Sequence, residues 1–182
     1  MTPLVSSKVG FSACIAVVGP GEGASAEACA DAKAVGQLLA AHGWVTLTGG
    51  RAAGVMAAAA DGASTAGGFV VGVLPGLDRR DAAPGLTLAL PTGLGEARNA
   101  VLVTAADAVI GCGLNPGTVS EIALALKAGK PTVLVRAAEC DVAFFAALAP
   151  DAQFRAASTP NEAVAWVATQ LPGLVTRSRA GQ

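Results

Sequence analysis

Residues 111–121 combine a glycine-rich turn with a single carboxylate, and this pattern is suited to holding an anion. The segment follows an apolar run at 108–110 and precedes an apolar helical pattern at 122–128. A helix that begins at Gly117 has unpaired amides in its first turn, and its dipole favours negative charge there. We expect Asn115 in the turn to adopt the left-handed conformation that short polar side chains tolerate. The residues of this segment expected to cradle a phosphate are Gly113, Asn115, Gly117 and Thr118.

Glu121 lies about one turn inside that predicted helix and faces whatever the turn holds. In a binding protein this carboxylate would orient the ligand. In an enzyme it could act as a general acid or base, or stabilise positive charge at a sugar carbon. The alternative is an ordinary carboxylate that the helix dipole favours near an N-terminus.

Arg98 and Asn99 open the preceding predicted helix, at 96–106. The helix dipole disfavours a cation in a first turn, so Arg98 is expected to serve a partner. That partner is either Glu121 or a ligand phosphate. An exposed surface position for Arg98 is the alternative.

Two further glycine-rich turns follow predicted strands. One contains Gly19 and Gly21, but Pro20 removes a donor and the spacing of a dinucleotide fingerprint is not met, so classical NAD binding is disfavoured. A simple turn without ligand contact is equally compatible with that segment. The other turn allows close backbone approach and offers an arginine that can grip a phosphate with two hydrogen bonds, unless that arginine is a plain surface residue. Its expected ligand contacts are Gly49, Gly50, Arg51 and Gly54.

Apolar runs alternate with helical patterns along the chain, which predicts an α/β fold with a Rossmann-like parallel sheet and helices on both faces. The predicted strands are 13–18, 44–47, 69–74, 86–90, 108–110 and 132–135. The predicted helices are 26–41, 54–66, 96–106 and 117–128, with weaker patterns at 142–148 and 161–171. We expect a single domain over residues 1–175 and a disordered tail at 176–182. Because the three glycine-rich turns all follow strands, they should meet at one edge of the sheet.

Composition narrows the class of protein. Hydrophobic residues make up 53% of the 182 residues and charged residues 14%, so we expect apolar area buried between subunits of a homodimer or homotetramer. There is no membrane-length apolar run and no secretory signal pattern, which predicts a cytoplasmic protein. The net charge of −1, without lysine and arginine clusters, disfavours nucleic-acid binding.

Catalytic histidine and metal chemistry have little support. The single histidine, His42, is expected to end a helix, which leaves no Ser-His-Asp triad. The four cysteines show no zinc-ligand spacing, so no metal site is predicted and the thiols are expected to be reduced and buried. Cys112 lies inside the phosphate-binding turn, and its role stays open.

The chain resembles the "lysine decarboxylase-like" Rossmann superfamily, which includes phosphoribohydrolases of nucleoside 5′-monophosphates. The resemblance is carried by Arg98 and by the segments 48–56 and 117–121. Leu114 and Asn115 stand where the hydrolases have glycines. The arrangement is more similar to the molybdenum-cofactor carrier branch, with matching segments at 43–44, 48–51, 72–76, 92–98, 115–121 and 123–131.

Membership of that branch implies a cytoplasmic homo-oligomer that binds molybdenum cofactor (molybdopterin), protects it and hands it to molybdoenzymes. The cofactor phosphate would lie on the 113–118 turn with charge from Arg51 and Arg98, and Glu121 would orient the ligand. The pterin would lie over the 19–23 and 49–54 turns, and the protein itself would hold no metal. The alternatives are a phosphoribohydrolase in which Arg98 and Glu121 are catalytic, and a nucleotide-sensing module.

Overall fold

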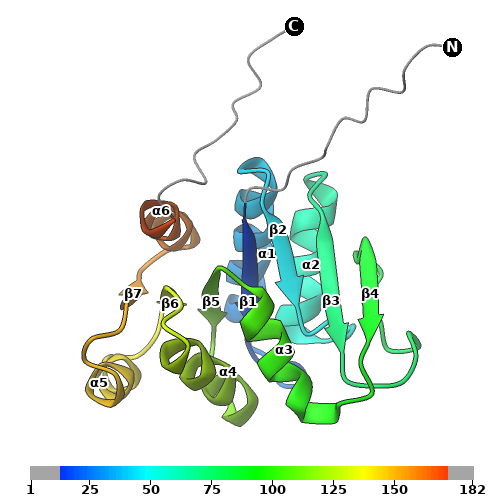
Figure 1. The fold of residues 1–182 in the computed structure, drawn as a ribbon. Coiled ribbons are helices and arrows are strands. Elements are labelled where there is room, and N and C mark those ends of the chain that lie inside the picture. Colours follow the sequence, from blue (N-terminus) through cyan, green and yellow to red (C-terminus); the bar gives the residue numbers. More distant parts are fainter. Residues whose placement is uncertain (1–12, 172–182) are drawn as a thin grey trace, which may run out of the picture.

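The computed structural model describes residues 13–171 and contains one seven-stranded sheet in which every pairing is parallel, in the order β4-β3-β2-β1-β5-β6-β7 (Figure 1). The strands are β1 (Cys14–Val18), β2 (Val45–Thr48), β3 (Val70–Leu74), β4 (Leu88–Pro91), β5 (Ala108–Cys112), β6 (Thr132–Val135) and β7 (Phe154–Ala157). The helices are α1 (Ala26–Ala41), α2 (Gly54–Thr65), α3 (Arg98–Ala105), α4 (Pro116–Lys127), α5 (Glu139–Leu148) and α6 (Pro160–Gln170). The predicted α/β class is confirmed. The tail predicted to be disordered, 176–182, lies outside the described residues.

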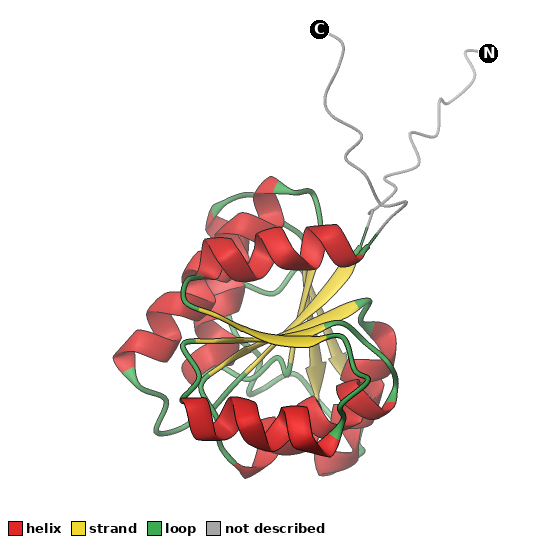
Figure 2. Ribbon diagram, turned by 90° about the vertical axis from the view of Figure 1, so that its left-hand side faces the viewer, coloured by secondary structure: helices red, strands yellow, loops and turns green. Residues whose placement is uncertain are grey.

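Helices cover both faces of the sheet (Figure 2). Successive side chains of a strand point to opposite faces, and β1 shows the consequence. Ile15 and Val17 pack into the core that α1, α2 and α6 cover, whereas Ala16 and Val18 pack into the core under α3, α4 and α5. Since both faces are buried, the central strands read as unbroken apolar runs.

Helix ends follow local sequence signals. Ser25 accepts a hydrogen bond from the amide of Ala28 and caps α1. At the other end, His42 caps α1 and Gly43 follows it with a φ of 69°. The predicted end of this helix at His42 is therefore confirmed.

Two elements differ from the sequence prediction. The edge strand β7 was not expected, because Phe154–Ala157 contains no β-branched residue and no apolar run; pairing with β6 stabilises it. The helix expected at 96–106 is divided into a short 3-10 turn, Gly95–Ala97, and α3. This division makes Arg98 the first residue of α3.

The order of the strands determines where the site lies. From β1 the chain adds β2, β3 and β4 on one side, and β5, β6 and β7 on the other. Parallel sheets bind ligands in the crevice at such a switch point, beyond the carboxyl ends of the strands. The turns after β1, β2 and β5 meet there, as the sequence predicted. Across the described residues, no helix is both long enough and apolar enough to cross a membrane.

Candidate functional site

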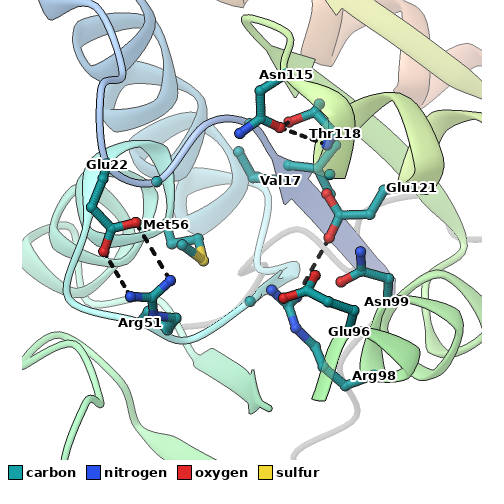
Figure 3. A pocket seen from close by; sticks show the side chains of 15 residues that line it. Val17, Glu22, Arg51, Met56, Glu96, Arg98, Asn99, Asn115, Thr118 and Glu121 are labelled. Carbon is teal, nitrogen blue, oxygen red and sulfur yellow. Dashed lines mark hydrogen bonds and ion pairs between the residues drawn. The ribbon is translucent and has the colours of Figure 1, made fainter. Parts of the chain in front are cut away.

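A cavity of about 250 Å³ lies beyond the carboxyl ends of β1, β2 and β5 (Figure 3). Side chains from the first turns of α3 and α4 line it together with the glycine-rich turns. The predicted binding residues that line this cavity are Gly19, Gly21, Gly49, Arg51, Arg98, Asn99, Asn115, Gly117, Thr118 and Glu121. The lining residues that were not predicted to contact a ligand are Val17, Val18, Glu22, Met56 and Glu96.

The other predicted contacts, Gly50, Gly54 and Gly113, do not line this cavity. All of them have positive φ angles, of 79°, 49° and 76°, so they shape the turns around it. Gly113 borders a neighbouring cavity of about 340 Å³. That second cavity contains the ion pair between Arg136 Nε and Asp31 Oδ2, at 3.0 Å.

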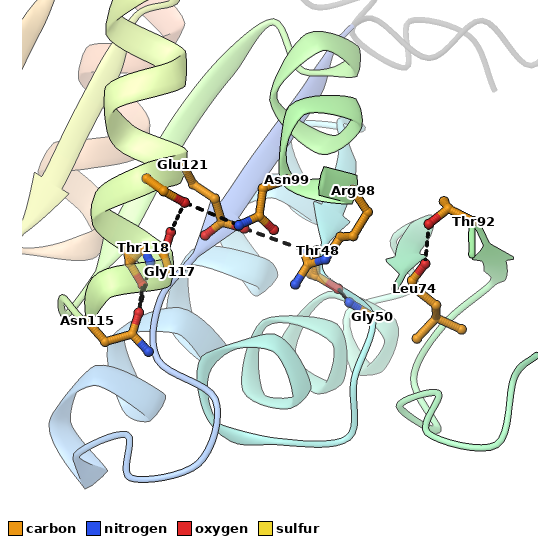
Figure 4. A network of polar contacts seen from close by, with 11 residues as sticks. Thr48, Gly50, Leu74, Thr92, Arg98, Asn99, Asn115, Gly117, Thr118 and Glu121 are labelled. Atoms are coloured by element: carbon orange, nitrogen blue, oxygen red, sulfur yellow. Dashed lines mark hydrogen bonds and ion pairs between the residues drawn. The ribbon is translucent and has the colours of Figure 1, made fainter. Parts of the chain in front are cut away.

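The N-terminus of α4 is capped by Asn115. Its side-chain oxygen accepts hydrogen bonds from the Thr118 amide at 2.8 Å and from the Thr118 hydroxyl at 2.9 Å (Figure 4). The expected left-handed conformation of Asn115 is wrong: its φ of −151° and ψ of 175° are extended. An N-cap needs extended backbone so that the side chain can reach back to the helix amides. Gly113 supplies the positive φ of this turn instead.

This cap reduces the number of amides that an anion can use. Pro116, at the start of α4, has no amide hydrogen, and the Thr118 amide already bonds to Asn115. Gly117, which lines the cavity, has no intrahelical partner for its amide at this position. The turn therefore offers an anion fewer free amides than the sequence predicted.

Arg98 is buried, with 8% of its surface exposed, so it is not a plain surface residue. Its Nη1 lies 3.4 Å from Oε1 of Glu121, which is 6% exposed. The guanidinium also packs over Gly49, where a Cβ would come within 2.6 Å of Nη1. Only glycine at position 49 permits this approach, which explains part of the paired-glycine motif.

Glu121 titrates near neutrality. Burial raises the pKa of its carboxyl from 4.5 to about 7, the Arg98 guanidinium acts in the opposite direction, and Glu96 raises it further. A carboxyl with such a pKa exchanges its proton at physiological pH, and it can therefore bind as an acceptor or as a donor.

Asn99 adds an amide to the same region. Its Nδ2 donates to Oγ of Ser120 at 3.3 Å, and that hydroxyl donates to the carbonyl of Gly117 at 2.7 Å. Ser120 therefore links α3 to the first turn of α4. Ser120 was not among the predicted site residues, although it lies between Thr118 and Glu121 in the motif.

Arg51 lies at the other end of the cavity and is partly exposed. Its Nη2 lies 2.6 Å and its Nη1 3.4 Å from the two carboxylate oxygens of Glu22 (Figure 3). The Arg51 guanidinium, which was expected to hold a phosphate, thus contacts the Glu22 carboxylate from the turn after β1. A ligand phosphate would share or displace that contact.

Cys112 is buried, with 1% of its surface exposed, and it does not line the cavity. Burial raises the pKa of its thiol, so the thiol stays protonated. Cys14 and Cys29 are half-buried and Cys140 is exposed, which differs from the expectation of buried thiols. In the described part of the chain, no three histidine, cysteine or acidic residues are grouped to hold a metal ion.

Known proteins share this fold and much of this sequence. The model of the SLOG cluster4 family matches residues 12–164. The molybdenum cofactor binding protein from the phototrophic bacterium Rippkaea orientalis is 40% identical, with a TM-score of 0.85, over 87% of this chain and 97% of that chain. The molybdenum cofactor carrier protein from Chlamydomonas reinhardtii is 37% identical, with a TM-score of 0.81, over the same shares of the two chains. A protein of Archaeoglobus fulgidus is 43% identical over 117 residues, which are 64% of this chain and 75% of that protein.

Proposed function

The chain belongs to the SLOG cluster4 family, and from this premise we propose that its cavity binds the molybdenum cofactor, protects it from oxidation and transfers it to molybdoenzymes. The observation that carries the proposal is the likeness to the Rippkaea orientalis protein, which extends over 97% of that chain at 40% identity. A likeness of this extent includes the strand ends and turns that build the site.

The cavity supports this proposal through its polar lining. The Gly117 amide and the Asn115 side chain offer hydrogen-bond donors at the α4 N-terminus, and they would meet the cofactor phosphate. Arg51 and Arg98 would add positive charge to the cavity, Arg51 at its outer end and Arg98 at its inner end. The pterin would lie over the turns after β1 and β2 with one edge toward Arg98, whose guanidinium packs over Gly49, and no bond need be made or broken.

The test is a protection assay. Cofactor released from a molybdoenzyme is exposed to air with or without the protein, and the surviving cofactor is measured by reconstituting an apo-molybdoenzyme. We expect the protein to lengthen the lifetime of the cofactor and Arg98→Ala to reduce that effect. The same lifetime with and without saturating protein would refute the proposal.

A second function is favoured by one observation, the buried pair of Arg98 and Glu121. A carboxyl whose pKa is about 7 is suited to acid–base catalysis at neutral pH, and a phosphoribohydrolase would use it at the sugar carbon. In that case AMP incubated with the protein would release adenine, and Glu121→Ala would abolish the release. If chromatography detects no adenine, the hydrolase function is refuted and the carrier function remains as the proposal.

The cellular setting follows the same premise. We propose a cytoplasmic homodimer or homotetramer with molybdoenzymes as acceptors. Because the cofactor carries its own molybdenum, the protein residues would bind the organic part and the phosphate.

A further inference from the structure

The inner end of the cavity, formed by Arg98, Asn99 and Glu121, contains unused hydrogen-bonding capacity. Among the described residues, the buried atoms Arg98 Nε and Asn99 Oδ1 have no hydrogen-bond partner. Buried polar groups in proteins are almost always paired, so two such atoms on consecutive residues point to a group that is supplied from outside the chain.

The orientation of the Asn99 amide follows from its neighbour. The Ser120 hydroxyl uses its proton on the Gly117 carbonyl, so its oxygen accepts a hydrogen bond from Asn99 Nδ2. The Asn99 Oδ1 atom is therefore the one left without a partner. A buried acceptor, Asn99 Oδ1, and a buried donor, Arg98 Nε, are thus both left unpaired on consecutive residues of α3.

The inner end is a poor site for an anion. Three carboxylates (Glu22, Glu96 and Glu121) and two guanidiniums (Arg51 and Arg98) line the whole cavity. Figure 3 shows Glu96 and Glu121 beside Arg98 and Asn99, whereas Arg51 lies with Glu22 at the opposite end. A phosphate at the inner end would face two carboxylates. An uncharged group with one acceptor and two donors fits instead.

Resting on the proposed function, we infer that the inner end recognises the carbonyl, ring N–H and amino edge of a 2-amino-4-oxopyrimidine ring. The ring carbonyl accepts a hydrogen bond from Arg98. The ring N–H and the amino group donate to Asn99 Oδ1 and to the Glu121 carboxylate. Both a pterin and a guanine base present this edge, and the phosphate of either ligand lies toward the Gly117 amide.

Recognition of this edge by the inner end of the cavity predicts strong selection among nucleotides. Adenine carries an amino group where the carbonyl is needed, and it lacks the ring N–H. A site built to hydrogen-bond such groups rejects an analogue that lacks them, because its own buried atoms stay unpaired. We expect AMP to bind at least about tenfold more weakly than GMP, with IMP, which lacks the amino group, between the two.

The experiment is a fluorescence titration with 6-hydroxymethylpterin, which has neither sugar nor phosphate. GMP, IMP, AMP and inorganic phosphate are then used as competitors. We expect the pterin to bind, GMP to displace it better than AMP, and phosphate to displace it poorly. Whichever of the pterin and GMP binds more tightly identifies the source of the ring.

Two variants connect the selection to these residues. We expect Asn99→Ala and Glu121→Gln to reduce the GMP over AMP preference to about twofold or less. Glu139→Gln, which changes an exposed carboxylate in the first turn of α5, should leave the preference as it is. Circular dichroism and thermal melting verify that each variant is folded.

Equal affinities of the wild-type protein for GMP and AMP would overturn the inference, and so would an unchanged preference in both variants. The protection assay separates this inference from the proposed function. Protection without base selection removes only the inference. Base selection without protection refutes the carrier function and indicates a protein that binds guanine nucleotides.

Discussion

Glu121 determines the main pH response of the site. Its carboxyl is buried, and its ion pair with Arg98 is long, with 3.4 Å between Oε1 and Nη1. Its pKa of about 7 in the folded chain lies above the ordinary value of 4.5. The folded state therefore holds a proton that the unfolded state releases between these two pH values. This contribution to stability is complete below about pH 4.5 and is lost as the pH rises through about 7.

Glu121→Gln removes this titration, because the amide stays neutral at every pH. We expect the free energy of unfolding of the wild type to fall, relative to the variant, by on the order of 2 kcal/mol between pH 4.5 and pH 8. Urea unfolding of both proteins across that range measures the difference. A difference that does not change with pH would contradict the assignment.

Residue types in the motifs were sufficient to propose Arg98 and Glu121 as partners. The helix dipole disfavours a cation at a helix N-terminus, so a partner for Arg98 was expected there. They were not sufficient for Asn115. Two roles were open to that residue, a left-handed turn position and an N-cap, and the cap is formed because Thr118 offers both an amide and a hydroxyl to its side chain.

At the scale of elements, the first turn of α4 connects stability to binding. Asn115→Ala removes the cap and should destabilise the protein by about 0.5–2 kcal/mol. Thr159→Ala is a matched control, since Thr159 caps α6 through the Glu162 amide in the same way. Chemical denaturation should give similar losses for both variants, while pterin and phosphate binding should weaken only for Asn115→Ala. Weakened binding in both variants would mean that the loss is global.

The turn between β2 and α2 requires close backbone contact. Gly54 has a φ of 49°, and a Cβ there would come within 2.1 Å of the Gly21 carbonyl oxygen, so Gly54→Ala should cost about 2–5 kcal/mol. Gly43 has a φ of 69° in open space, so Gly43→Ala should cost only about 1–2 kcal/mol. Thermal melting of the two variants tests whether Gly54→Ala is the more destabilising. Equal losses of stability would show that the Gly21 carbonyl moves aside at little cost.

At the scale of the whole molecule, exposed apolar side chains gather at the β4 edge of the sheet. Leu88 and Leu90 alternate along β4 and are 40% and 41% exposed, and Leu77 and Leu94 are exposed nearby in sequence. An unpaired sheet edge with apolar side chains is prone to association. This feature is consistent with the proposed homo-oligomer.

We expect the protein to sediment above its 17.7 kDa monomer mass, and the double variant Leu88→Glu with Leu90→Glu to sediment as a monomer. Phe144→Glu, on the exposed face of α5, is the control and should leave the assembly intact. Dissociation by Phe144→Glu alone would place the interface at α5. A monomeric wild type would remove the proposed oligomer.

The sequence by itself determined the alternation of strands and helices, the end of α1 at His42 and the edge of the sheet where the glycine-rich turns meet. These features depend on side-chain periodicity and on neighbours within a few residues, which the linear chain displays. Only the tertiary structure decided that Glu22 contacts Arg51, that Asn99 Oδ1 is left without a partner, and that β7 completes the sheet. Those contacts join segments far apart in sequence, and their energies depend on burial and distance, which exist only once the chain is folded.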